Sequence, residues 1–107
     1  MSINNVQTFD FADELTGVMT GSAVTIGSLS ENPVIIIFDN QGTVAVAISV
    51  NGGTSTWKTF PAGEALVLDL RGNHGIAPNG TFRKGTTFTG TGASGTFSIS
   101  YIYASNA

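Results

Sequence analysis

Bulky apolar side chains recur at every second position through much of this sequence, which is the period of a β-strand that faces a core on one side. The alternation is clearest over residues 44–50, 65–70 and 96–103, where smaller or polar residues occupy the intervening positions. Helical periodicity is scarce, and only Asp10–Leu15 is compatible with a single helical turn. The pattern therefore predicts an all-β protein.

Further strands are predicted around these segments. Val34–Phe38 is apolar at every position, which is typical of a central strand covered on both faces, or of an edge strand that a neighbouring subunit covers. Less regular segments at Val6–Phe11, Val18–Ile26 and Thr81–Thr89 also predict strands, and another is expected around Thr54–Phe60.

Turn residues separate the predicted strands at short intervals. Asp39–Gly42 is expected to join Val34–Phe38 to Thr43–Val50 as a hairpin. Asn51–Gly53 predicts a second hairpin, leading to the strand around Thr54–Phe60, because Asn-Gly favours the positive φ of tight hairpin turns.

Pro61–Gly63 predicts the next turn, and residues 71–80 are expected to form an irregular loop. About seven or eight short strands separated in this way predict a single antiparallel β-sandwich of the jelly-roll or immunoglobulin-like type. At 107 residues, with no repeat or linker composition, residues 1–107 are expected to form one domain. Residues 1–7 are a candidate extended N-terminal arm.

The charge pattern excludes some classes of partner. Only 10% of the residues are charged, and the net charge is −3 with four basic residues. Arg83-Lys84 with distant Lys58 and Arg71 does not form the basic stripe that phosphates require, so no nucleic acid is expected as a partner, nor an anionic membrane surface. No apolar run approaches the ~20 residues of a membrane-spanning helix. The N-terminus lacks the pattern of a secretory signal.

Small residues dominate the composition. Glycine, threonine and serine make up 38 of the 107 residues. Such a surface is polar yet loses little on desolvation, as expected where a protein faces other subunits; the alternative is a β-protein rich in threonine and turns. Cysteine is absent, which excludes disulfides and thiolate metal sites.

Gly90–Gly95 matches the G-x-G-x-x-G pattern of dinucleotide-binding loops. That loop binds a pyrophosphate where it leaves a strand and opens a helix, whereas residues 96–103 alternate as a strand. Only 12 residues follow Gly95, fewer than the ~20 that separate the motif from its ribose-binding acid. We therefore expect a glycine-rich turn between strands, and no cofactor.

Candidates for catalysis are few. His74 is the only histidine and is expected in a loop, so an enzyme using it would have to recruit Asp39, Glu64 or Asp69 through the fold. Paired carboxylates can carry acid–base chemistry, but hydrogen-bonding and turn-capping roles are expected for the acids here. No G-x-S-x-G nucleophile elbow is present. The sequence predicts no enzyme, no metal site and no catalytic residue.

Trp57, Lys58 and Phe60 are candidate residues for an interface or ligand platform. The single tryptophan follows the Asn-Gly turn. It is expected either in the core or at the surface, where it would stack on a sugar ring or anchor a subunit interface. Phe60 and Phe88 present the same two alternatives.

Three stretches support a family resemblance: ISVNGGTSTW over residues 48–57, FPAGEALVLDLR over residues 60–71, and YIYA over residues 101–104. Together, over roughly residues 33–104, they resemble small β-sandwich virion structural proteins of tailed bacteriophages, which decorate the head or lie at the neck and tail.

The resemblance implies a virion protein that is assembled in the bacterial host cytoplasm and has no enzymatic activity. A capsid decoration or cement protein that binds the capsid surface as a homo-oligomer is the first expectation. Its partners would be copies of itself and a major capsid or tail protein. The alternatives are a carbohydrate-binding or receptor-binding module of a tail structure, and a neck or tail structural protein.

Overall fold

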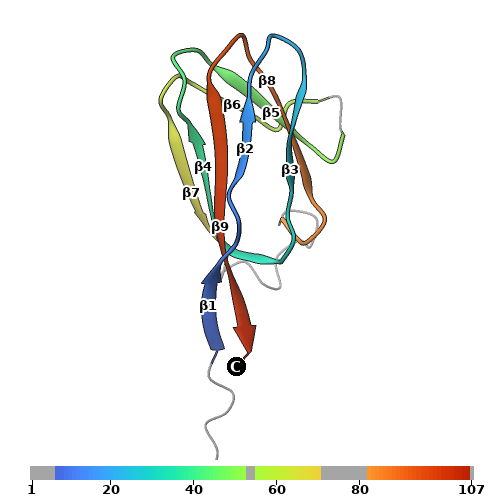
Figure 1. Cartoon of the computed structure of the whole chain (residues 1–107), viewed down its shortest axis with the longest axis vertical. Coiled ribbons are helices and arrows are strands. Elements are labelled where there is room, and N and C mark those ends of the chain that lie inside the picture. Colours follow the sequence, from blue (N-terminus) through green and yellow to red (C-terminus); the bar gives the residue numbers. More distant parts are fainter. Residues whose placement is uncertain (1–6, 53–54, 71–81, 107) are drawn as a thin grey trace, which may run out of the picture.

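The computed structural model describes residues 7–52, 55–70 and 82–106, in which nine strands form two antiparallel sheets packed face to face (Figure 1). No helix occurs among these residues, and so none that could cross a membrane. The all-β sandwich that the alternation predicts is confirmed. The strands are β1 (Gln7–Phe11), β2 (Leu15–Val18), β3 (Val24–Ser28), β4 (Pro33–Asn40), β5 (Val46–Val50), β6 (Lys58–Phe60), β7 (Ala65–Asp69), β8 (Thr87–Thr91) and β9 (Thr96–Asn106).

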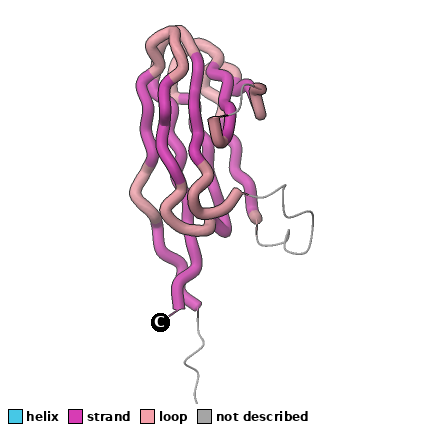
Figure 2. The backbone as a smooth tube through the Cα atoms, turned by 90° about the vertical axis from the view of Figure 1, so that its right-hand side faces the viewer, coloured by secondary structure: helices cyan, strands magenta, loops and turns pink. Residues whose placement is uncertain are grey.

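The two sheets have different strand orders. Sheet A has the order β1-β9-β4-β7, and β2 pairs with the first half of β9. Sheet B has the order β3-β8-β5-β6. Figure 2 shows the two layers from the side. The long strands β4 and β9 form the centre of sheet A, so most of its side chains stand on these two strands.

The core lies between the sheets and is filled by alternate residues of each strand. This arrangement follows from the strand period of two, and it confirms that the predicted bulky faces of 44–50 and 97–103 point inward, whereas Ile102 between Tyr101 and Tyr103 points outward. Of the largest apolar side chains that are fully buried, five stand on the central strands β4 and β9 of sheet A and four stand on sheet B. Those of sheet A are Ile36, Phe38, Phe97, Ile99 and Tyr101, and those of sheet B are Val46, Ile48, Phe60 and Phe88.

The hairpin predicted at Asp39–Gly42 is wrong. β4 lies in sheet A and β5 lies in sheet B, so the chain crosses between the sheets here instead of folding back beside itself. The strand predicted from Thr43 also begins later, at Val46. Turn residues were correctly recognised, but their composition does not distinguish a hairpin from a crossing between sheets.

Asn40 fixes this crossing. Its side chain is buried, and its Nδ2 donates to the carbonyl oxygens of Val44, Phe60 and Pro61 at 2.9–3.0 Å. Its Oδ1 accepts from the Gly42 N–H at 3.0 Å. The amide thus supplies a hydrogen-bond donor to three backbone carbonyls beside the crossing, as buried carbonyls require.

Two other strand predictions are corrected. Val18–Ile26 is two strands, because the chain leaves β2 in sheet A and enters β3 in sheet B through residues 19–23. The strand predicted at Thr81–Thr89 begins only at Thr87, after a turn. The helical turn considered at Asp10–Leu15 is absent: both ends of that segment belong to strands.

The second predicted hairpin is confirmed in its pairing, but the strand predicted around Thr54–Phe60 begins only at Lys58, so residues 51–57 join the two strands. β5 pairs with β6, and Asn51 and Gly52 between them have φ of 55° and 70°. These are the positive values that Asn-Gly accommodates in a tight turn. The turn before β7 is also confirmed, since the Glu64 N–H donates to the Pro61 carbonyl at 3.1 Å.

The glycine-rich segment is a turn between strands, as predicted, and it carries the chain from β8 in sheet B to β9 in sheet A. Gly95 has a φ of 95°, and a Cβ placed there would lie 2.8 Å from the Gly42 Cα. Two inter-sheet crossings therefore touch backbone to backbone at this end of the sandwich, and only glycine permits that approach.

A two-stranded ribbon extends from the other end of the sandwich (Figure 1). It consists of β1 and the last residues of β9, which pair in register from Gln7 with Asn106 to Phe11 with Ile102. Gln7 thus belongs to β1, and the rest of the arm predicted over residues 1–7 lies outside the described residues.

Candidate interaction surfaces

Trp57 packs between the two sheets beside the edge strand β6. Its ring lies 5.2 Å from that of Phe38 and 5.1 Å from that of Phe82, centre to centre. Its backbone N–H donates to the Ile48 carbonyl at 2.7 Å. Because 38% of the residue stays exposed, Trp57 belongs to the rim of the core and keeps part of its ring at the surface.

The other two predicted platform residues have different environments. Lys58 is partly buried; its Nζ lies 3.1 Å from Glu64 Oε1 and 4.8 Å from the centre of the Phe60 ring, which adds a cation–π attraction to the ion pair. Phe60 is fully buried, as is Phe88, so neither provides surface for a platform. The structure leaves Trp57 and Lys58 at the surface, and their role in binding stays a prediction.

The outer face of sheet A carries an apolar surface that the sequence analysis did not identify. The register places Phe11, Ile102 and Ile35 side by side across β1, β9 and β4, and it places Ile37 beside Val67 of β7. On β4, β7 and β9 these positions alternate with residues that pack on the core, so they point away from it, and Phe11 lies on the same face as its partner Ile102. Phe11 is 78% exposed and Val67 is 59% exposed. We name this surface the apolar patch, and it comprises Phe9, Phe11, Ile35, Ile37, Val67 and Ile102.

The rim of the apolar patch is acidic. Glu14 lies over the same face, because its carboxylate accepts hydrogen bonds from Ser100 Oγ at 3.2 Å and from Thr16 Oγ1 at 3.3 Å. Asp39 stands on the outer face of β4, in register with Ala65. No lysine or arginine occurs in the strands of sheet A. The face therefore combines large apolar side chains with negative charge that no basic residue of the sheet balances.

One sequence signal pointed to this surface. Val34–Phe38 is apolar on both faces, and burial of both faces was expected. β4 is a central strand, paired on both edges and covered by the core on one side, which confirms the first alternative for its pairing. Its outer residues Ile35 and Ile37 stay partly exposed. The expected cover on that side is not supplied by the described part of the chain.

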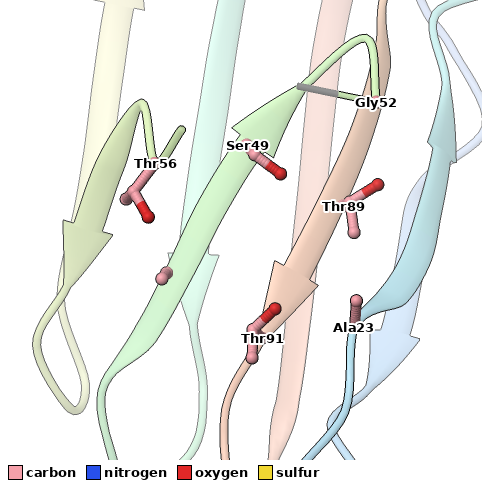
Figure 3. Close-up of a pocket in the computed structure, with 7 residues that line it drawn as sticks. Ala23, Ser49, Gly52, Thr56, Thr89 and Thr91 are labelled. Atoms are coloured by element: carbon pink, nitrogen blue, oxygen red, sulfur yellow. The ribbon is translucent and has the colours of Figure 1, made fainter. Parts of the chain in front are cut away.

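A shallow hollow of about 460 Å³ lies on the outer face of sheet B (Figure 3). Small and hydroxylated side chains line it, without a charged group or an aromatic ring. It therefore offers hydrogen bonds but neither an acid–base pair nor a stacking surface. Its lining residues are Ala23, Ala47, Ser49, Gly52, Thr56, Thr89 and Thr91.

The described residues contain no cluster of three or more histidine, cysteine, aspartate or glutamate side chains that could hold a metal ion. His74 lies outside the described residues. Of the acids considered as its partners, Glu64 is paired with Lys58, whereas Asp39 and Asp69 stand on β4 and β7 in sheet A. The predictions made for His74 stay predictions.

Comparison with known proteins gives one structural likeness. No family model matches the sequence, and no curated protein matches it. A solved chain from Bacillus endospore appendages, described as a novel family of disulfide-linked pili, aligns with 96% of this chain and 94% of its own length, at a TM-score of 0.46 and 18% identity. This likeness does not assign the chain to a family. The resemblance to bacteriophage virion proteins accordingly stays a prediction.

Proposed function

We propose that this chain is a non-enzymatic structural subunit that assembles into a multi-copy particle through the outer face of sheet A. The apolar patch is the observation that carries the proposal. Contiguous exposed apolar surface is uncommon on soluble monomers and is typical of interaction sites. The β1–β9 ribbon adds to the argument, because a two-stranded ribbon is marginally stable until another surface packs on it. A protein partner would bury both features.

The valines at positions 67 and 18 provide a matched test. Both stand on sheet A, with 59% and 61% exposure, but only Val67 lies in the apolar patch. Val67→Ser should weaken self-association five- to tenfold, since losing one buried aliphatic side chain costs about 1 kcal/mol of binding free energy. Val18→Ser should leave association unchanged. Val18 pairs with Thr96 on the same outer face but away from the patch. Sedimentation velocity over a range of concentrations measures both variants, and equal effects of the two substitutions would refute the apolar patch as the contact surface.

Within this class, we propose a decoration protein of a tailed-bacteriophage capsid, with a neck or tail component as the alternative. The support is the sequence resemblance over residues 33–104, together with the small-residue composition. On a symmetric shell one modest patch is used many times, so weak contacts per copy suffice. Quantitative mass spectrometry of purified particles should find the chain in a fixed ratio to the major capsid protein. Particles that lack the chain would exclude this role.

Carbohydrate binding is the second candidate function, and the exposed part of Trp57 favours it. A sugar ring that stacks on indole changes its emission, and this chain has a single tryptophan, so fluorescence titration reports on that residue alone. A saturable change with an oligosaccharide would support glycan binding if calorimetric titration shows that Trp57→Ala, with the fold retained, no longer binds the same sugar. Emission that no sugar alters would exclude Trp57 as the platform.

A further inference from the structure

A turn between residues 83 and 86, just before β8, presents two basic side chains. The Thr86 N–H donates to the Arg83 carbonyl at 3.0 Å, and the Arg83 N–H donates to Thr86 Oγ1 at 3.2 Å. Two further bonds tie the turn to Leu29 after β3: Gly85 N–H to the Leu29 carbonyl at 2.8 Å, and Leu29 N–H to the Thr86 carbonyl at 2.9 Å. We name residues 83–86 the basic turn. Its backbone is held in place, so its side chains start from a defined position.

The basic turn supplies the cations that are available in the described part of the chain. Lys58, the other basic residue there, is already paired with Glu64 at 3.1 Å. Arg83 and Lys84 are exposed, and within the described residues neither forms an ion pair. A held pair of exposed, unpaired cations is complementary to an acidic surface.

The apolar patch is such a surface, and its charge argues against pairing with itself. Two patches face to face would bring Glu14 and Asp39 of one copy near the same carboxylates of the other. Like charges within the Debye length, about 8 Å at physiological ionic strength, repel each other. The opposite charge is carried by the basic turn, which stands before β8 of sheet B and not on the patch. Charge complementarity therefore favours the basic turn of another copy as the occupant.

We infer that the basic turn of one copy docks on the apolar patch of a second copy; this inference rests on the proposed function. A guanidinium stacks on an aromatic face and pairs with a carboxylate at the same time. The exposed ring of Phe11 and the carboxylate of Glu14 offer both contacts three residues apart in the chain. Lys84 adds a second charge toward the acidic rim, and the aliphatic stems of both basic side chains cover apolar surface.

Charge reversal and mixing test the contact. One double variant carries Glu14→Lys at the patch rim together with Asp13→Lys at the exposed residue before it, and the other carries Arg83→Glu and Lys84→Glu in the basic turn. All four side chains are exposed, so both variants should keep the wild-type circular dichroism spectrum. Each variant alone should lose self-association in sedimentation velocity, by tenfold or more. An equimolar mixture should regain it, because the reversed rim of one variant then matches the reversed turn of the other.

A control and three outcomes complete the test. Ser22→Lys adds one positive charge in the exposed turn between β2 and β3, and it should associate as the wild type does. If the wild type assembles but neither reversal weakens assembly, or if the mixture does not restore it, this contact is wrong while the proposed function stands. If the wild type stays monomeric at every concentration and does not bind particles, the proposed function and this contact both fail.

Discussion

Replacing Asn40 with aspartate tests how the chain crosses between the two sheets. The two side chains have nearly the same shape, and the carboxylate can still accept the hydrogen bond from the Gly42 N–H. It cannot donate. The carbonyl oxygens of Val44, Phe60 and Pro61, which lie 2.9–3.0 Å from Asn40 Nδ2, would then face an oxygen atom instead of an amide.

The size of the effect follows from these contacts. The amide has two N–H groups, and a lost hydrogen bond that leaves a buried partner unpaired costs about 1–3 kcal/mol. We expect Asn40→Asp to lower the free energy of unfolding by about 3 kcal/mol with the carboxyl neutral, and by more when it is charged. Burial and the facing carbonyls raise the pKa of the introduced carboxyl in the folded state.

The pH dependence has a definite sign. Because the folded-state pKa is raised above the unfolded value of about 4, the folded variant binds more protons than the unfolded chain between the two pKa values. The stability of the variant relative to the wild type therefore rises as the pH falls through the folded-state pKa, and it levels off below about pH 4.

Urea denaturation of the wild type and the variant between pH 4 and pH 8 measures this difference. The control is Asn32→Asp, because Asn32 is exposed and its Oδ1 accepts from the Lys84 N–H, which a carboxylate also does. That control should change stability by about 0.5 kcal/mol or less. A loss for Asn40→Asp below about 1 kcal/mol, independent of pH, would refute the role given to the buried amide.

Two further predictions concern other parts of the fold. Gly95→Ala should destabilise the protein by about 3 kcal/mol, because its φ is 95° and its Cβ would lie 2.8 Å from the Gly42 Cα. Gly63→Ala is the control, because Gly63 has a φ of 72° and open space around it, and it should lower the free energy of unfolding by about 1 kcal/mol. Thermal denaturation measures both variants, and equal decreases in Tm would contradict the close approach of Gly95 to Gly42. Tyr101→Phe should cost about 1–2 kcal/mol in urea denaturation, because the buried hydroxyl bonds to the Ser30 N–H and to Ser30 Oγ at 2.8 Å. An unchanged midpoint would show that these bonds contribute nothing.

The alternation of apolar and polar residues with a period of two predicted most of the fold. Alternation over residues 44–50 and 96–103 correctly identified the side chains that face the core, because one face of each strand must pack on it. Ser98 on the opposite face is also buried, and it accepts a hydrogen bond from Gln41 Nε2 at 2.8 Å. The Asn51-Gly52 turn was predicted correctly for an equally local reason, since those two residues adopt a positive φ with little strain.

Sheet membership was not predictable in the same way. The turn at Asp39–Gly42 contains ordinary hairpin residues, yet the chain crosses to the other sheet there. The cause is the bonding of Asn40 to Phe60 and Pro61, about 20 residues along the chain, and this contact exists only in the folded protein.

The candidate sites show the same division. The sequence identified Trp57 and Lys58, which stay at the surface. It could not show that the side chain of Phe60 points from the edge strand β6 into the core between the sheets. The apolar patch was missed because its members come from four strands, and Phe11 and Val67 are brought to one face only by sheet pairing. A surface made by register leaves no contiguous motif.

Hydroxyl-radical footprinting of the assembled protein tests the central claim most directly. The claim is that the outer face of sheet A is covered in the assembly, so Phe11, which is 78% exposed in the single chain, should be protected there. Met19, which is 3% exposed in the single chain, stays buried in both forms and serves as an internal reference. We expect oxidation of Phe11 to fall several-fold between the dilute monomer and the assembled form, while oxidation of Met19 stays constant. Phe11 oxidised to the same extent in both forms would contradict the claim.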